Sequence, residues 1–303
     1  MKAPSRLRAP EAAASRSAEP GRSSRRTKLI ASRAVAYATM ALLAVPFVVP
    51  GLWMLSASLK PNSQIFAYPP TLWPSTWQWS NYVEIFTVQP FARQYGNSLY
   101  IAVVVTAVTV FTSSLAGFAF ARLRFRGSGP LFLVLMSGFF IPEEVTLIPL
   151  YKIIGSLGLM NTHVPLILMP IFSGTGVVAT FIMRQAFLAI PRELQDAARV
   201  DGLDWFGTYW RIALPLVRPS IGVVIVLAAL NSWNMFLEPL VFLRDNKLFT
   251  LPVALTQYED AYTGPMWNLQ MAASSVTLIT ILIVFIAAQR QIIAGLTQGS
   301  IKG

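Results

Sequence analysis

The sequence contains no cysteine and a single histidine, His163, among its 303 residues. The lack of cysteine excludes disulfides, thiolate nucleophiles, Cys-based zinc sites and iron–sulfur clusters. One histidine excludes a His-cluster metal site and disfavours a His-based catalytic triad. The motifs G-x-x-x-x-G-K-[ST], H-E-x-x-H and G-x-S-x-G are absent as well. We therefore expect no catalytic residues, no metal and no cofactor bound by this chain.

Charged side chains are also scarce. They make up 12% of the residues, whereas ordinary soluble domains carry about 25%. Apolar residues reach 54%, and the mean hydropathy is +0.56. So few charges cannot cover the water-facing shell of a globule of this size, and the lipid bilayer is the alternative solvent. The composition indicates an integral membrane protein.

Apolar windows of about 20 residues predict six transmembrane helices and an all-α protein. Five windows are long and nearly free of charge, and a sixth, 127–151, is interrupted by Glu143 and Glu144. The five long windows are 34–59, 94–121, 153–183, 219–243 and 261–289. Between the first two we expect an extracytoplasmic loop, 60–93.

The basic residues indicate how the helices are oriented. With a cytoplasmic N-terminus, 19 of the 24 lysines and arginines lie inside and five lie outside. Both termini are therefore expected in the cytoplasm. The net charge of +11 could suggest a nucleic-acid partner, but the distribution of the basic residues indicates membrane orientation instead, so no nucleic-acid partner is expected. Residues 1–33 read as a basic disordered tail. Residues 34–59 exceed the apolar core of a signal peptide and so predict an uncleaved anchor helix.

The inside loop 184–218 has the pattern of two short helices joined by a sharp turn. Pro191 precedes the first helix, and Gly202 ends it because glycine adopts the left-handed conformation without steric cost. Asp204 can cap the second helix, Pro215 is expected to stop it, and Pro219 to begin the next span. Small residues near the turn, Ala197 and Ala198, would let another protein approach the backbone.

This loop resembles the EAA loop of ABC-importer permeases. Asp196-Ala197-Ala198 occupies the position of Glu-Ala-Ala, with Asp201-Gly202 and Leu214-Pro215 at the family's spacing. Aspartate in place of glutamate keeps the charge and shortens its reach. In that family the loop is a coupling helix that docks into an ATP-hydrolysing subunit. The resemblance implies this role for Asp196, Ala197, Ala198, Asp201, Gly202, Leu214 and Pro215. The alternative is a surface helix pair without a partner.

Further stretches resemble carbohydrate-uptake permeases of the maltose-transporter type, over about 97–303. They are 116–127, 141–151, 232–240 and 295–303. The resemblance implies the ABC type I importer permease fold, with a core at 94–290 and a cytoplasmic tail at 291–303. It also implies a bacterial plasma (inner) membrane location and several partners: a second homologous permease, two ATPase subunits that bind ATP and magnesium, and an extracytoplasmic solute-binding protein.

The resemblance leaves the solute open. A sugar permease is the first interpretation, and glycerol phosphate or a polyol is the main alternative. An ion-coupled secondary transporter would use membrane carboxylates but leave the cytoplasmic helix pair idle. An integral-membrane enzyme would need a catalytic constellation that the sequence does not offer.

Polar residues within the fifth window are candidates for the translocation path. Asn231, Asn234 and Glu238 follow i, i+3, i+7 and would share one helix face, beside Trp233. Amides and a carboxylate bind hydroxyls, and an indole ring can stack on a pyranose. Hydrogen bonding to the partner permease is the alternative. Glu143, near an expected helix break after Pro142, is a weaker candidate for substrate contact, as is Glu144.

The second window carries small residues at i, i+4 and i+8, namely Ser113, Gly117 and Ala121. Small side chains let helix backbones approach closely in lipid. The spacing therefore predicts a helix–helix packing face.

Overall fold

The computed structural model describes the backbone of residues 22–260, 262 and 264–300, and the side chains of 31–259, 262, 264–283, 285 and 286. The chain divides into two compact units, Met1–Trp53 and Met54–Gly303. The described part of the first unit belongs to helix α1 (Arg22–Ala57), in which Ala31–Ala57 is long and apolar enough to cross a membrane.

The prediction that residues 1–33 are disordered is wrong for residues 22–33, because helix α1 begins at Arg22. Arginine, lysine, alanine and leucine are good helix formers, and a helix already present in the apolar run extends at little cost. Residues 1–21 lie outside the described residues.

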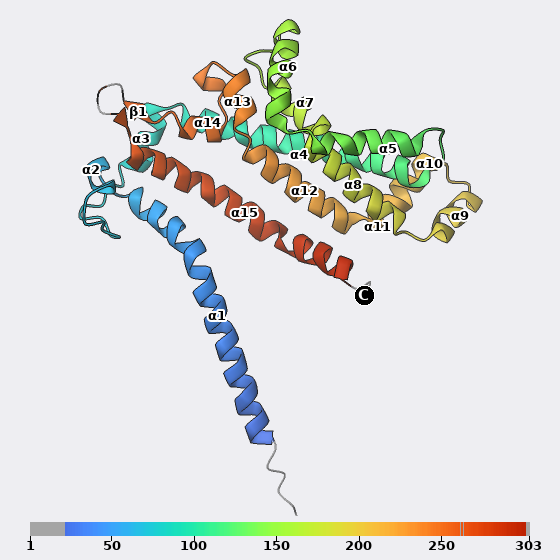
Figure 1. Cartoon of the computed structure of the whole chain (residues 1–303), viewed down its shortest axis with the longest axis horizontal. Coiled ribbons are helices and arrows are strands. Elements are labelled where there is room, and N and C mark those ends of the chain that lie inside the picture. Colours follow the sequence, from blue (N-terminus) through green and yellow to red (C-terminus); the bar gives the residue numbers. More distant parts are fainter. Residues whose placement is uncertain (1–21, 261, 263, 301–303) are drawn as a thin grey trace, which may run out of the picture. The chain divides into compact units, whose positions relative to one another are not determined.

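The second unit is helical almost throughout (Figure 1). Its first elements are α2 (Asn62–Ile65), α3 (Asn81–Val88), α4 (Phe91–Arg122), α5 (Ser128–Ser137), η1 (Gly138–Phe140), α6 (Glu143–Ser156), α7 (Val164–Phe172) and α8 (Gly174–Leu188). They are followed by α9 (Arg192–Val200), α10 (Trp205–Thr208), the π-helical turn η2 (Tyr209–Ala213), α11 (Leu214–Leu216) and α12 (Arg218–Trp233). The last are α13 (Leu237–Phe242), η3 (Asn246–Leu248), α14 (Leu251–Leu255), the antiparallel strands β1 (Glu259–Asp260) and β2 (Gly264–Pro265), and α15 (Trp267–Ser300).

Within the described residues, two single helices are long and apolar enough to span a membrane, Ala31–Ala57 and α4. The number rises to five if each of three bent helix pairs is one span. The apolar stretch Trp267–Ile283 of α15 is shorter. The structure thus supports a polytopic helical protein, and the count of six spans remains a prediction.

Two of the apolar windows are not the continuous helices that the sequence predicts. In the window 153–183, α6 ends at Ser156 and the chain turns through residues of positive φ, Gly158 (68°) and Asn161 (57°). The window 219–243 breaks after Trp233, and a short helix, α13, follows. Apolar content measures affinity for lipid, whereas helix breaks depend on a few turn-forming residues, so hydropathy alone misses them.

Two further bends lie between α5 and α8. The predicted break near Pro142 is confirmed, because α5 with η1 and α6 meet at 101°. Helices α7 and α8 meet at 46° at Ser173. A Cβ atom at Gly176 would lie 1.8 Å from the carbonyl oxygen of Ile171, so glycine is needed where the two helices approach at this bend.

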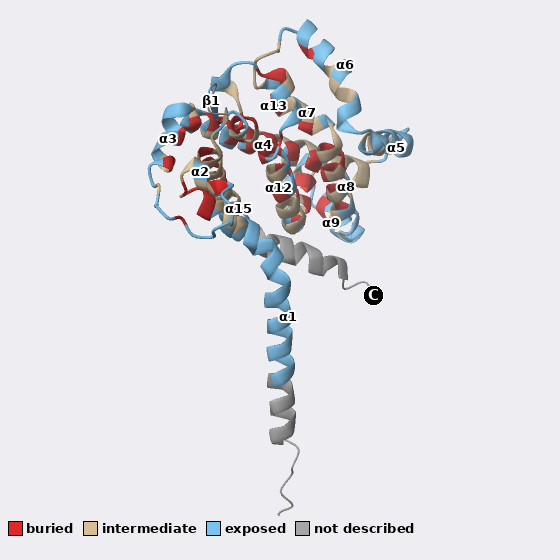
Figure 2. Cartoon of the chain, turned by 60° about the vertical axis from the view of Figure 1, so that its left-hand side comes forward, coloured by how far each residue is buried: buried red, intermediate tan, exposed pale blue. Residues whose placement is uncertain are grey.

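Helix α4 is the centre of the second unit. It packs along α8 and α12, and α12 packs on α15 (Figure 1). A Cβ at Gly117 would lie 2.7 Å from the Cβ of Met183 on α8, and Ser113 is almost fully buried, so the predicted small-residue packing face is confirmed. Buried residues concentrate along these helices, while α5 is mostly exposed (Figure 2).

Candidate functional site

Three helix breaks meet around one cavity of about 820 Å³. The break between η1 and α6 contributes residues 141–143, the α7–α8 bend contributes Gly174 and Thr175, and the α12–α13 break contributes 234–238. Non-helical backbone in a membrane protein is tolerated where it is buried in protein or lines a cavity, and interrupted helices commonly form solute sites in transporters. The position of the breaks therefore marks this cavity as the candidate site.

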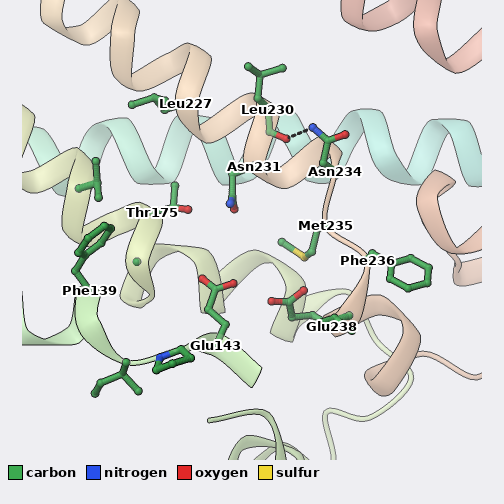
Figure 3. A pocket seen from close by; sticks show the side chains of 15 residues that line it. Phe139, Glu143, Thr175, Leu227, Leu230, Asn231, Asn234, Met235, Phe236 and Glu238 are labelled. Carbon is green, nitrogen blue, oxygen red and sulfur yellow. Dashed lines mark hydrogen bonds between the residues drawn. The ribbon is translucent and has the colours of Figure 1, made fainter. Parts of the chain in front are cut away.

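Two carboxylates, two amides and a hydroxyl dominate the polar lining. Figure 3 shows Glu143 and Glu238 projecting into the space between the breaks, with the amide of Asn231 opposite them. Each glutamate lies in the first turn of its helix, Glu143 in α6 and Glu238 in α13. The partial positive charge at a helix N-terminus stabilises a carboxylate there. No lysine or arginine is among the 15 lining residues.

The predicted pair Asn231 and Asn234 reaches the cavity, but the two amides are used differently. Asn231 is exposed and faces the carboxylates (Figure 3). Asn234 ends α12, and its Nδ2 donates a hydrogen bond of 2.8 Å to the carbonyl oxygen of Leu230. Glu238 joins them through the break at 234–236 rather than through the helical periodicity that the sequence suggested. Asn231, Asn234 and Glu238 therefore line one space, as predicted, but the predicted reason, a shared face of one continuous helix, is wrong.

Trp233 is not brought to this cavity. Its side chain is 6% exposed, contacts the ring of Tyr95 edge-on with centroids 6.0 Å apart, and lines a second, apolar cavity of about 380 Å³ between α4, α12 and α15. On a helix, residue 233 points about 200° away from residue 231, which accounts for the opposite orientation. The geometry gives no support for stacking of Trp233 on a sugar here.

Sequence reasoning missed Phe139, Gly174 and Thr175 in the lining. The run Ser173-Gly174-Thr175-Gly176 interrupts an otherwise apolar window with small and polar residues, and it is the signal that could have found them. A Cβ at Gly174 would lie 3.9 Å from Oε1 of Glu143 and from the ring of Phe139, so a methyl group fits at this point and only a larger side chain would fill the cavity.

A second candidate feature is the helix pair in the loop 184–218. Helix α9 follows Pro191 and ends at Val200, immediately before the predicted turn at Asp201-Gly202, in which Gly202 has a φ of +83°. The turn is closed by hydrogen bonds from the amides of Asp201 to Ala197 (3.0 Å) and of Leu203 to Ala198 (3.0 Å). Asp204 caps α10 by accepting a 2.7 Å hydrogen bond from the amide of Gly207. These predicted caps are confirmed.

The second helix ends one residue past Pro215, at Leu216, which is close to the predicted stop. Helical structure continues from α10 through the π-helical turn η2 and α11 to Leu216, and then bends by 80° into α12. Pro215 lies in the first turn of α11, where its missing N–H is tolerated. Pro219 occupies the first turn of α12, as predicted.

The residues expected to contact a partner are presented unequally. Asp196, Ala197, Asp201 and Gly202 are exposed, whereas Ala198 is 2% exposed and packs inside the chain. Leu214 and Pro215 are half-buried. Only one of the two alanines is thus open to close approach by another protein, because adjacent helical positions point about 100° apart.

The helix pair is attached firmly to the long helices. Tyr209 is 2% exposed, packs on Phe118 and Phe187, and shares a 2.8 Å hydrogen bond between its hydroxyl and that of Ser114 on α4. Burial raises the pKa of the Tyr209 phenol, so it stays neutral. Arg122 donates hydrogen bonds to the carbonyl oxygens of Phe187 and Ile190. The helix pair is therefore held against α4 and α8 by both packing and hydrogen bonds.

A polytopic apolar helical unit with a polar cavity at its helix breaks, together with a charged helix pair anchored to the same long helices, is the architecture of a membrane permease. The chain belongs to the family of binding-protein-dependent transport system inner membrane components, whose model matches residues 110–297. It is therefore an inner-membrane component of such a transport system.

Similar proteins extend over nearly the whole chain. The chain is 38% identical over 272 residues to the arabinooligosaccharides transport system permease protein AraQ of Halalkalibacterium halodurans, covering 89% of this chain and 95% of that protein. It is 34% identical over 265 residues to AraQ of Bacillus subtilis, covering 86% and 93%. The predicted resemblance to carbohydrate-uptake permeases is confirmed.

The fold also matches a solved structure. A chain of a bacterial ABC transporter involved in the import of the acidic polysaccharide alginate superposes with a TM-score of 0.72 at 20% identity, covering 90% of this chain and 99% of that chain. At this identity the match shows the fold alone.

Proposed function

We propose that the chain is a permease subunit of an ATP-driven importer and that an uncharged carbohydrate passes through the cavity at the three helix breaks. The relatives that transport arabinooligosaccharides support a carbohydrate solute. In the proposed assembly a second homologous permease completes the pathway, and an extracytoplasmic binding protein delivers the solute. Two ATPase subunits bind ATP and magnesium, and this chain itself has no catalytic role.

The observation that carries the proposal is the charge of the cavity. Two carboxylates and no basic side chain line about 820 Å³, a volume suited to small ligands. Carboxylates accept hydrogen bonds from hydroxyls, and amides both accept and donate them, in each case without a charged partner. A phosphate or sulfonate group would meet like charge in a medium that screens poorly. The cavity therefore favours a neutral sugar over glycerol phosphate, and a neutral polyol remains the alternative.

The proposed topology has six spans with both termini in the cytoplasm, consistent with the distribution of lysine and arginine. In it, α9 lies on the cytoplasmic side and docks on an ATPase subunit. The exposed surface of α9 around Asp196, Ala197 and Gly202 supports this role, and so does the 87% exposure of Val200, an apolar side chain left uncovered within the described chain. ATP-driven closure of the ATPases would push on α9 and move α4 and α8 through Tyr209 and Arg122.

The test is uptake of radiolabelled solutes by a strain that lacks this gene and carries wild type or a variant. Wild type should restore vanadate-sensitive uptake of an arabinooligosaccharide or another neutral sugar from a panel. The double variant Glu143→Gln/Glu238→Gln should alter KM or rate for the neutral sugar and reduce discrimination against an acidic analogue. The matched control is Glu84→Gln on α3, which is outside the cavity.

Three results would contradict the proposal. Wild type that transports only anionic solutes would refute the charge assignment. Unchanged kinetics and selectivity in the double variant would remove the cavity from the pathway. Uptake that is insensitive to vanadate and abolished by a protonophore would indicate an ion-coupled transporter.

A further inference from the structure

A large basic cavity of about 880 Å³ lies beside α9, apart from the cavity at the helix breaks. Six arginines line it: Arg122, Arg124, Arg126, Arg184, Arg192 and Arg199. They come from the end of α4 and the loop after it, from α8 and from α9. Asp196 is the single carboxylate in the lining. These elements gather at one end of the second unit (Figure 1).

The positive charge of this cavity exceeds what its one carboxylate can neutralise. Across the described residues, none of the six arginines forms an ion pair with a carboxylate. The guanidinium of Arg184 lies 4.3 Å from the ring centroid of Phe132, and its Nε is buried without a hydrogen-bond partner. The guanidinium of Arg199 lies over Trp205 at 4.9 Å. Six like charges around one space repel one another, so an anion bound there would be strongly favoured.

The surroundings of the cavity indicate that the anion is attached to hydrocarbon. Apolar side chains, among them Phe120, Phe125, Leu188 and Trp205, line the same space. Helix α5 starts at the cavity with Ser128, has no buried residue, and exposes Leu133 (70%) and Val134 (68%). Arginines at the end of a span, next to an uncovered apolar helix, match a phosphate headgroup with its acyl chains.

We propose that this cavity binds the phosphate headgroup of an anionic phospholipid, with the acyl chains along α5. The walls join the long helices, through Arg122 and Arg184, to α9, through Arg192 and Arg199. A bound headgroup therefore holds α9 against α4 and α8. The mechanical link from α9 to these two helices then depends on the lipid. The lipid site stands on its own, whereas its effect on coupling rests on the proposed function.

Binding is measured on the complete transporter complex in nanodiscs of phosphatidylcholine, with and without phosphatidylglycerol, by native mass spectrometry. Wild type should retain phosphatidylglycerol. The double variant Arg124→Gln/Arg126→Gln should bind it about 25-fold more weakly, since each arginine near a membrane surface contributes about a five-fold factor. The matched control Arg211→Gln/Arg218→Gln removes the same charge from residues outside the cavity and should bind as wild type does.

A second readout is the stimulation of ATP hydrolysis by solute, which should rise with phosphatidylglycerol in wild type and respond less in the double variant. If the complex binds phosphatidylglycerol but its ATP hydrolysis does not respond to the lipid, only the coupling role is refuted. If the complex transports no solute, the lipid-binding measurement still tests the site. Equal binding by wild type and double variant would overturn the site. Displacement of the lipid by millimolar inorganic phosphate would assign the cavity to a soluble phosphate. Lipid binding to the permeases alone, lost in the complete complex, would assign the cavity to the ATPase surface.

Discussion

Substitution of Gly202 separates the docking role of the α9 turn from its conformational role. The residue has φ of +83°, and a Cβ built on it meets no atom within 4 Å. A non-glycine residue therefore pays only the left-handed backbone cost, about 1–2 kcal/mol, with no clash inside the chain. Gly202→Asp should leave membrane insertion and folding close to wild type, as measured by yield and thermal unfolding in detergent.

The same substitution should nearly abolish uptake and solute-stimulated ATP hydrolysis, because it places a charged side chain on the surface proposed to dock on the ATPase. Gly158→Asp is the matched control. Its φ is +68°, its Cβ also meets nothing within 4 Å, and it lies in the connection between α6 and α7. It pays a similar backbone cost and should keep most of the uptake. Full uptake by Gly202→Asp, or an equal loss in Gly158→Asp, would refute the docking role.

Three further substitutions test the packing, the cavity and the cap. Gly117→Val should sharply reduce the folded yield in fluorescence-detected gel filtration, because its Cβ would lie 2.7 Å from that of Met183. The control Gly96→Val has open space on the same helix and should keep the wild-type yield. Equal yields from the two variants would contradict the packing. Gly174→Leu should lower uptake at least ten-fold because the leucine side chain fills the cavity, whereas the control Gly174→Ala should transport normally. Normal transport by the leucine variant would exclude this cavity from the pathway. Asp204→Ala should cost about 1 kcal/mol of cap energy and speed hydrogen exchange in α10 about five-fold; unchanged exchange would show that the cap is dispensable.

The sequence by itself determined the features that depend on composition or on neighbouring residues. The shortage of charge and the apolar windows required a membrane protein, since both are summed over the chain. The turn at Gly202 after α9 and the cap of α10 at Asp204 were also predictable, because a helix cap involves residues within one turn. The motif around Asp196 led to the family for the same reason, since its spacing is local.

The tertiary structure decided which polar residues share a space. Glu143, Gly174 and Glu238 are separated by tens of residues and meet only because three helices break at the same cavity. Periodicity assumed one continuous helix through Glu238 and placed Trp233 with the wrong neighbours. The arginine cavity likewise combines segments from Arg122 to Arg199. Such convergence depends on how helices pack against one another, and packing depends on contacts between residues far apart in the chain, which no local pattern records.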